Sequence, residues 1–451
     1  MDAARSSTRL EVQASGITAD GCGIFHAAGM DIEVPGTVPG DFAKIEAMPH
    51  GKGRRCKGRL MGLITASKDR AAAESICKFQ GSCGGCPFGL LSEAAQLRRK
   101  REMLAASLRK AGIRKLELPA IVPSAPGVSR FKGIRFFSQE GERVIQGFYR
   151  RASHEVIEVP SCPRECAWFG ALADAVAELA SSMGVRAYGE ETHAGTLRAI
   201  AMRDCGGGTM AVLTHAGDLA PSFSKALADL MQERGIASAW TLRNDSEGNS
   251  IMGGALSHLS GAQSVTVSLN GFEYSAGPRT FLQVNYPVAQ RLYAAVLSWC
   301  GSDPEGMALD LCCGAGAMTL PLARAFKKAA GVEIVEEAVE AARENARMNH
   351  VGNASFIAGD LAEELPGLID DGVSAAIADP SRRGLGTQAC RALSRMRRGA
   401  RLALVFCGLQ ALERDLPVVV EGGFVVRSSQ GFDMFPGSSA LESLVLLEKE
   451  K

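Results

Sequence analysis

Hydrophobic and polar residues follow three different patterns along the chain, and the first covers residues 8–67. Apolar residues alternate with polar ones in short runs, which Gly, Pro and Asp separate at short intervals. Short alternating runs with such breaks are typical of the strands of a small β-barrel. The expected strands are Thr8–Ala14, Gly23–Ala28, Met30–Val34, Asp41–Met48 and Arg59–Ala66.

The second pattern, over residues 69–274, mixes helical and extended periodicity. It predicts a helix over Ala94–Lys110, with Ser92 as the N-cap. Further along, short strands are interrupted by two helical stretches, Glu165–Met183 and Ala220–Arg234. We expect this part of the chain to form a central α+β domain.

From Ser275 onward strands and helices alternate, which predicts a doubly wound, largely parallel α/β sheet. The expected strands are Met307–Leu311, Ala329–Val332, Ala354–Ala358, Ala375–Ala378 and Arg401–Phe406. The three patterns divide the chain into predicted domains at 1–68, 69–274 and 275–451.

Composition narrows the class of protein. The 451 residues carry a net charge of +1, and 46% of them are hydrophobic. No apolar run reaches the ~20 residues that a membrane span needs. The segment Met1–Ser7 lacks the apolar core of a signal peptide, so we expect a cytoplasmic protein without a membrane partner. No obligate protein partner is indicated, and the near-neutral charge leaves nucleic-acid binding to be decided by local basic segments.

The chain contains 13 cysteines, and three of them lie close together in Cys77-x5-Cys83-x2-Cys86. Without an export signal, such cysteines favour a metal site or catalysis over disulfides. The spacing suits an iron–sulfur cluster, while zinc stays an alternative because Cys-x2-Cys pairs usually bind zinc. A fourth ligand must come from elsewhere, and the candidates are Cys162 and Cys166.

The strand Met307–Leu311 leads into a tight turn with Gly314 and Gly316, where the backbone can approach a ligand closely. Neither the lysine of a P-loop nor the third glycine of a dinucleotide-binding turn follows. Acidic residues end or follow four successive strands: Asp310, Glu333, Asp360 and Asp379.

The carboxyl ends of parallel strands meet at one edge of a sheet, so we expect these acids to surround a pocket. Carboxylates suit a ribose hydroxyl and a cationic ligand. S-adenosylmethionine offers a ribose, an α-amine and a sulfonium, and we therefore interpret this domain as a methyltransferase.

A cysteine, Cys407, ends the fifth strand of this domain. A methyltransferase needs a thiolate when the acceptor atom is a weak nucleophile, as carbon 5 of a pyrimidine is. Addition of the thiolate at carbon 6 makes carbon 5 electron-rich enough to accept the methyl group. A base must then remove the carbon-5 proton, and Glu442 is the candidate. The alternatives are a buried strand cysteine and a surface carboxylate.

Taken together, these features resemble the RNA 5-methyluridine methyltransferase family over nearly the whole chain. The matching segments are the TRAM-like start with its basic run Lys52–Arg59, the cysteines Cys77, Cys83, Cys86 and Cys162, Phe281–Asn285, Asp310–Gly316, Glu333, Asp360, Asp379–Pro380, Cys407, Arg414–Leu416, and Phe432–Pro436 with Glu442.

The resemblance implies a class I S-adenosylmethionine-dependent methyltransferase domain, an OB-like TRAM barrel that binds RNA, and a central iron–sulfur domain. It implies that Cys407 is the nucleophile and Glu442 the base, acting on a uridine of 23S ribosomal RNA first and of tRNA second. A [4Fe-4S] cluster would be held by Cys77, Cys83, Cys86 and Cys162. S-adenosylmethionine would be bound by Gln283, Cys312, Gly314, Glu333, Asp360 and Asp379.

Three departures from the family pattern lie beside these residues. The nucleophile is followed by Gly408-Leu409 where the family usually has Asn-Pro, Ser381 replaces a proline, and the base follows Ala440-Leu441 in place of His-Val. Two alternatives therefore remain open. One is an RNA-binding iron–sulfur protein with an impaired methyltransferase domain, and the other is a methyltransferase with a non-RNA substrate.

Overall fold

The computed structural model describes residues 8–27, 29–48, 54–248, 251–369 and 372–450. Ala28 of a predicted strand, and Lys52 and Gly53 of the basic run, lie outside these residues. The chain forms two compact units. The first contains residues 1–100, 148–159 and 435–439, and the second contains residues 101–147, 160–434 and 440–451.

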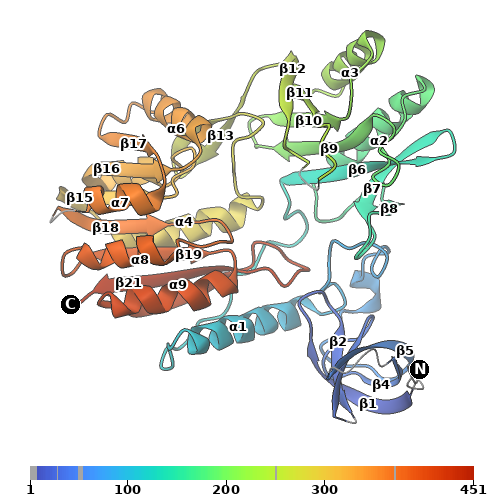
Figure 1. Cartoon of the computed structure of the whole chain (residues 1–451), viewed down its shortest axis with the longest axis horizontal. Coiled ribbons are helices and arrows are strands. Elements are labelled where there is room, and N and C mark those ends of the chain that lie inside the picture. Colours follow the sequence, from blue (N-terminus) through green and yellow to red (C-terminus); the bar gives the residue numbers. More distant parts are fainter. Residues whose placement is uncertain (1–7, 28, 49–53, 249–250, 370–371, 451) are drawn as a thin grey trace, which may run out of the picture. The chain divides into compact units, whose positions relative to one another are not determined.

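The first unit begins with a closed barrel of five strands, as predicted (Figure 1, blue). The strands are β1 (Thr8–Ile17), β2 (Gly23–Ala27), β3 (Met30–Val34), β4 (Phe42–Met48) and β5 (Arg55–Thr65). Strand β5 begins earlier than expected, because Cys56 and Gly58 continue its inward-facing positions. A Cβ at Gly58 would lie 2.7 Å from Cγ2 of Ile32, so this inward position has no room for a side chain.

A cysteine-bearing segment with one short helix, η1 (Ala73–Ser75), follows the barrel and leads into α1 (Glu93–Lys110). The predicted N-cap is present, since the Ala95 N–H donates to Ser92 Oγ at 3.3 Å. Helix α1 begins in the first unit and ends in the second.

The central part of the chain forms a seven-stranded sheet in the order β12-β11-β10-β9-β6-β7-β8. Its strands are β6 (Lys132–Glu140), β7 (Arg143–Tyr149), β8 (Val156–Glu158), β9 (Leu197–Asp204), β10 (Thr209–His215), β11 (Ser238–Arg243) and β12 (Ala255–Gly261).

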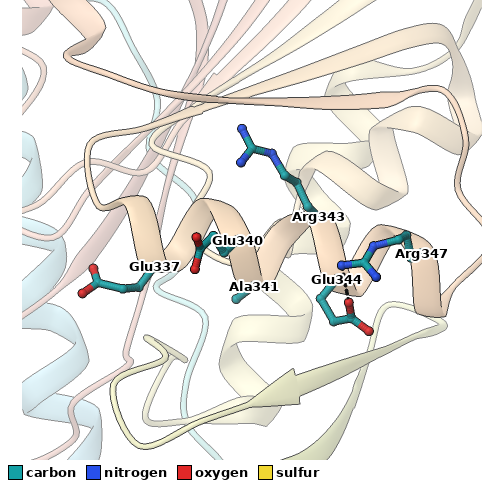
Figure 2. Close-up of a pocket in the computed structure, with 6 residues that line it drawn as sticks. All are labelled: Glu337, Glu340, Ala341, Arg343, Glu344 and Arg347. Atoms are coloured by element: carbon teal, nitrogen blue, oxygen red, sulfur yellow. Dashed lines mark ion pairs between the residues drawn. The ribbon is translucent and has the colours of Figure 1, made fainter.

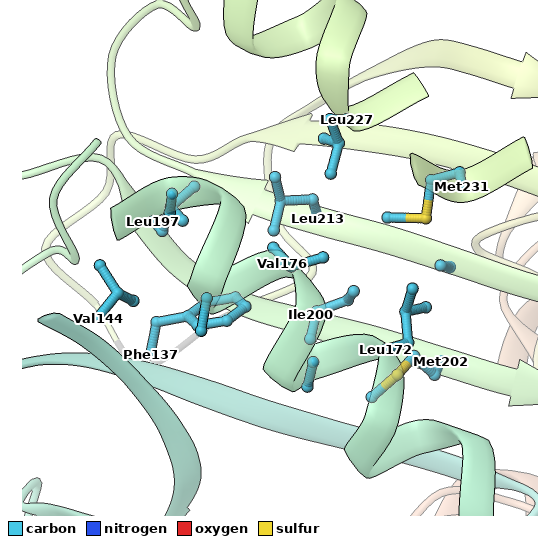
Figure 3. Close-up of a cluster of buried hydrophobic side chains, with 14 of the residues drawn as sticks. Phe137, Val144, Leu172, Val176, Leu197, Ile200, Met202, Leu213, Leu227 and Met231 are labelled. Carbon is cyan, nitrogen blue, oxygen red and sulfur yellow. The ribbon is translucent and has the colours of Figure 1, made fainter. Parts of the chain in front are cut away.

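Helices α2 (Ala167–Ser182) and α3 (Pro221–Glu233) pack against this sheet and confirm the two predicted helical stretches. Figure 3 shows side chains of α2, among them Leu172 and Val176, among strand residues such as Ile200 and Leu213, all of them buried. This apolar core makes the central domain a sheet covered by two helices.

The C-terminal part begins with the hairpin β13 (Val265–Leu269) and β14 (Phe272–Ala276), then forms a second seven-stranded sheet in the order β17-β16-β15-β18-β19-β21-β20. The strands are β15 (Asp303–Leu311), β16 (Phe326–Glu333), β17 (Ala354–Ala358), β18 (Val373–Ala378), β19 (Arg401–Phe406), β20 (Phe424–Phe432) and β21 (Glu442–Lys449). The helices are α4 (Tyr286–Cys300), α5 (Thr319–Ala325), α6 (Glu336–Met348), α7 (Leu361–Leu368), α8 (Thr387–Ala392), η2 (Leu393–Arg395) and α9 (Leu409–Glu421).

In this sheet the first five strands run parallel and β21 inserts antiparallel between β19 and β20. Helices α7, α8 and α9 lie on the near face of the sheet in Figure 1, with α4 behind it. The predicted doubly wound sheet is therefore present. The sequence pattern did not predict β20 and β21, and β21 is what places Glu442 inside the sheet. No helix in the described part of the chain is long and apolar enough to cross a membrane.

Candidate active site

The turn after β15 is held in a strained conformation. Cys312 has a φ of 90°, which is rare for a residue with a side chain, and Gly314 and Gly316 also have positive φ. The backbone N–H groups of Cys312 and Cys313 both donate to the carbonyl oxygen of Val332, at 2.9 and 3.0 Å. Strain of this kind is typical of places where the backbone contacts a ligand.

A pocket lies beside this turn, with about 670 Å³ of empty space if the open solvent at its mouth is included. Four of the residues predicted to bind the cofactor line it: Gln283, Cys312, Gly314 and Asp379. The other walls come from aromatic and acidic side chains, including Tyr274, Phe281, Tyr286, Tyr293 and Asp310.

Asp310 lies at the base of the pocket and is only 2% exposed. Burial raises the pKa of its carboxyl to about 7, although the Thr319 hydroxyl donates to Oδ2 at 2.6 Å and opposes the shift. The negative charges of Asp379 and Glu333 raise this pKa further. A cation bound in the pocket would stabilise the ionised form of Asp310, which burial otherwise disfavours. The sulfonium group of S-adenosylmethionine is such a cation.

Asp379 follows β18 and faces the same pocket. Burial raises its pKa, and the Gln283 amide, which donates to Oδ2 at 3.4 Å, opposes the shift. Tyr293 of α4 is buried near both aspartates, and burial followed by their negative charge raises the pKa of its hydroxyl well above the usual value. Among the described residues, neither Asp310 nor Asp379 forms an ion pair with a lysine or arginine side chain.

The structure gives Glu333 and Asp360 different positions from the other predicted cofactor residues. The Glu333 carboxylate accepts from the N–H of Gly314 at 3.1 Å and from the N–H of Val335 at 3.0 Å, so it braces the glycine turn. Asp360 is exposed and caps α7 by accepting from the Ala362 N–H at 2.8 Å. Neither residue lines the pocket.

Cys407 comes directly after β19 and is half-buried. Its Sγ lies 3.8 Å from the carbonyl oxygen of Pro380. Burial raises the pKa of the thiol to about 11, and the negative charges of Glu442 and Asp379 add to the shift, while Arg382 opposes it. Without a ligand the sulfur is therefore a protonated thiol at neutral pH, not the thiolate that attack requires.

Glu442 begins β21 and is 2% exposed. Its Oε2 has no hydrogen-bond partner in the described part of the protein. Burial raises the pKa of this carboxyl, the charge of Asp379 raises it further, and Arg382 lowers it. A buried carboxyl with an unused oxygen can accept a proton once it is ionised, and the charge of Arg382 favours the ionised form.

Sequence reasoning missed three residues of this arrangement: Thr319, Tyr293 and Arg382. The motif Asp379–Arg382 was recognised in the sequence. Its arginine, two residues after the Pro that follows a strand end, could have indicated a positive charge near the acids. Thr319 and Tyr293 carried no local signal, because only the packing of α5 and α4 brings them to the pocket.

The predicted cluster ligands fall in both units: Cys77, Cys83 and Cys86 in the first, Cys162 in the second. The N–H of Gly85 donates to Cys83 Sγ at 3.3 Å. Over the described ranges, no group of three or more His, Cys, Asp or Glu side chains is arranged to hold a metal ion. The iron–sulfur domain is therefore not shown. Cys166, the other candidate, is a half-buried thiol at the N-cap position of α2, where desolvation raises its pKa to about 12.

A second hollow lies on the outer face of α6 and is lined by charged side chains (Figure 2). Arg343 points away from Glu337 and donates to the carbonyl oxygen of Phe356 at 3.0 Å, and Glu344 pairs with Arg347. None of these residues was a candidate for catalysis or binding, and a helix face with mixed charges is normally a solvated surface.

The chain is similar to known proteins over nearly its whole length. The family model for tRNA (uracil-5-)-methyltransferases matches residues 256–450. An uncharacterized RNA methyltransferase of Halalkalibacterium halodurans is 31% identical over 447 residues, which cover 97% of this chain and 96% of the relative. Another from Geobacter sulfurreducens is 30% identical and covers 98% of this chain and 90% of the relative.

Among solved structures, the tRNA (uracil-54, C5)-methyltransferase of Pyrococcus abyssi, in complex with S-adenosyl-L-homocysteine, has a similar fold. It is 21% identical, with a TM-score of 0.76, and the match covers 98% of this chain and 100% of that one. The pocket, the barrel and these relatives agree. The chain belongs to the RNA (uracil-5-)-methyltransferase family, whose members transfer a methyl group from S-adenosylmethionine to RNA.

Proposed function

We propose that this enzyme methylates carbon 5 of a uridine in structured RNA through a covalent bond between Cys407 Sγ and carbon 6 of the base. The observation that carries the proposal is the electrostatic grouping of a half-buried thiol, Cys407, with the buried carboxyl of Glu442, whose Oε2 has no hydrogen-bond partner among the described residues, and with the pocket acid Asp379. A nucleophile and a base of this kind are what carbon-5 methylation of a pyrimidine demands.

The chemistry divides into three steps. The Cys407 thiol loses its proton to solvent, and Sγ bonds to carbon 6, which places negative charge on carbon 5 and the adjacent carbonyl; the cysteine later leaves as a thiolate. Carbon 5 then takes the methyl group while the sulfonium becomes a neutral thioether. Finally Glu442 accepts the carbon-5 proton, the double bond re-forms and the cysteine leaves.

Arg382 supports the first and last of these steps, because its charge lowers the pKa of both Cys407 and Glu442. Its side chain is exposed. A target base that excludes water would strengthen this interaction.

For S-adenosylmethionine we propose the pocket beside the glycine turn. Gln283, Cys312, Gly314 and Asp379 would contact it directly, and Asp310 would balance its positive charge. Glu333 would act through the turn that it braces and, at the mouth, through ribose hydroxyls. Asp360 remains in the proposed set on the family resemblance, with its oxygen Oδ1 already engaged as a helix cap.

For the cysteines we propose a [4Fe-4S] cluster on Cys77, Cys83 and Cys86, with Cys162 as the fourth ligand. The donor set fits chemically, since an N–H donor to a thiol sulfur, as at Cys83, favours the thiolate that ligates iron. Such a cluster would join the Cys77–Cys86 segment to Cys162 rigidly and could be oxidised or reduced. We assign no step of the methyl transfer to it.

As the target we propose 23S ribosomal RNA, with tRNA as the second candidate. The names of the matching family model and of the Pyrococcus abyssi structure favour tRNA, whereas the combination of a TRAM-like barrel with the cysteine motif favours ribosomal RNA. Mass-spectrometric mapping of 5-methyluridine in ribosomal and transfer RNA, with and without the gene, separates them.

The covalent mechanism is tested with RNA that carries 5-fluorouridine, since fluorine cannot leave as a proton does. The intact enzyme with S-adenosylmethionine should form a methylated adduct that survives denaturing electrophoresis. Cys407→Ala should form none while still binding RNA. An adduct in the Cys407→Ala variant, or methyl transfer by it, would refute the assignment.

A further inference from the structure

The segment just before the proposed base belongs to the first unit, while the base itself belongs to the second. Residues 435–439, here the base-leading segment, cluster with the barrel and cysteine-bearing segment, whereas β20 before it and Glu442 after it cluster with the methyltransferase sheet. The chain therefore leaves the sheet after β20, forms part of the first unit over residues 435–439 and rejoins the second unit two residues before Glu442.

Three hydrogen bonds within the first unit hold the base-leading segment. The N–H of Phe88 donates to the carbonyl oxygen of Gly437 at 2.7 Å. The N–H of Gly437 donates to Oε1 of Gln96 at 2.8 Å. Nζ of Lys100 donates to the carbonyl oxygen of Phe435 at 3.0 Å. The partners of the base-leading segment are two residues of α1, Gln96 and Lys100, and Phe88, which lies two residues after the last cysteine of the motif.

Gln96 is the central group of this contact. It is 5% exposed, and its Nε2 donates to the carbonyl oxygen of Leu91 at 2.9 Å while Oε1 holds Gly437. Both ends of the amide are therefore used, which fixes its orientation. A buried donor left without this acceptor loses a hydrogen bond that water cannot easily replace.

Gly437 packs so closely that a side chain there would be strained. Its φ is +83°, and an added Cβ would lie 3.1 Å from Cys86 Sγ and 3.3 Å from Cys86 Cβ. The base-leading segment is thus seated on the cysteine motif itself, and the position of its backbone depends on the conformation of Cys86–Phe88.

We propose that Gln96 is a positioning residue for catalysis. Through the backbone of Gly437 it holds the base-leading segment, and so sets where the Glu442 carboxylate lies relative to the carbon-5 proton. The proposal rests on the assignment of Glu442 as base. It links the cysteine-bearing segment and α1 to one step of the reaction, the release of product, and not to the attack by Cys407.

The two halves of the reaction can be separated because only the second half needs the base. If Glu442 is displaced, Cys407 still attacks and the methyl group is still transferred, but the carbon-5 proton stays and the enzyme remains bonded to methylated RNA. Misplacing a catalytic group by about 1 Å commonly costs on the order of 100-fold in rate. We therefore expect slow release with nearly normal adduct formation.

The test follows adduct formation and decay in single turnovers of the full-length enzyme with labelled, unmodified RNA. Gln96→Ala should slow decay about tenfold or more and leave the rate of formation within about twofold. Gln96→Glu keeps the acceptor for Gly437 and should restore most of the release rate. Gln13→Ala is the matched control, since it also removes an amide bonded to a backbone carbonyl in the first unit, that of Gly40.

The outcomes separate the two proposals. If Glu442→Gln accumulates methylated adduct while Gln96→Ala releases product at the wild-type rate, the positioning role is refuted and the base is retained. Equal slowing of formation and decay in Gln96→Ala, with a lower melting temperature, would mean a structural role only and also overturns the inference. If Glu442→Gln accumulates no adduct, the base assignment fails. Gly437→Ala should reproduce the slow release, because its new Cβ would lie 3.1 Å from Cys86 Sγ and would displace the base-leading segment.

Discussion

Replacing Asp310 by Asn should stabilise the ligand-free protein at alkaline pH. The carboxyl is almost fully buried, and its pKa is raised from 3.8 to about 7. Below pH 3.8 it is protonated in both the folded and the unfolded chain, so it costs nothing. As the pH rises above 3.8, this carboxyl ionises in the unfolded chain but stays protonated in the folded one, so the free energy of unfolding decreases. The decrease is complete above pH 7, where the carboxyl is ionised in both states.

The magnitude follows from the shift. About three pKa units at roughly 1.4 kcal/mol each give a penalty of up to about 4 kcal/mol at pH 8. An asparagine is neutral at every pH and can keep the acceptor for the Thr319 hydroxyl, so Asp310→Asn should recover much of this energy at pH 8 and almost none at pH 4. The variant should also lose affinity for S-adenosylmethionine, because the sulfonium then lacks its counter-charge.

Thermal melting of both proteins from pH 4 to pH 8, with calorimetric titration of the ligand, measures the two effects. Asp245→Asn is the control with the opposite sign: the N–H of Gly217, and then Arg243, lower the pKa of that exposed carboxyl, so its loss should destabilise the protein at pH 8. If Asp310→Asn melts at no higher temperature than the wild type at pH 8, the claim that the ionised Asp310 carboxylate destabilises the ligand-free protein is wrong.

Three further predictions concern the same domain. The affinity ratio of S-adenosylmethionine to S-adenosylhomocysteine should rise between pH 5.5 and pH 8, because Asp310 and Asp379 ionise over this interval and only the first ligand carries a sulfonium; a ratio that calorimetry finds constant would contradict this. Arg382→Ala should shift the pH–rate profile of single-turnover methyl transfer to higher pH, since loss of the positive charge raises the pKa of both Cys407 and Glu442, whereas Arg382→Lys should shift it little; an unchanged profile in the alanine variant would count against the role of this charge. Gly316→Ala should destabilise the protein by about 1–3 kcal/mol, because φ is +87° and the new Cβ would lie 3.3 Å from Phe356, while Gly352→Ala meets no atom and should melt as the wild type does.

The barrel and the doubly wound sheet could be predicted because their signals are local. Alternation with period two marks each barrel strand, and an acid or cysteine at the end of a strand marks the active edge of a parallel sheet. The motif at Asp310–Gly316 shows the turn before any contact is known. Boundaries were less accurate, as β5 shows, because Gly58 belongs to the strand through its pairing with Ala47 of β4, which is distant in the sequence.

What each acid does was decided by packing. Asp310, Glu333 and Asp360 look alike along the chain, yet one is buried under the pocket, one braces the glycine turn and one caps an exposed helix. Burial and hydrogen-bond partners determine a carboxyl's pKa, and both depend on residues distant in the sequence.

The same distinction holds for the proposed base. The sequence by itself determined that a carboxylate follows the Phe432–Pro436 motif, because residue order is all that a motif needs. Only the tertiary structure decided that Glu442 enters a buried strand and that the base-leading segment before it is held by Gln96 and Phe88. Such contacts join residues hundreds of positions apart, and no local pattern of hydrophobic and polar residues encodes which distant backbone amide a buried side chain will meet.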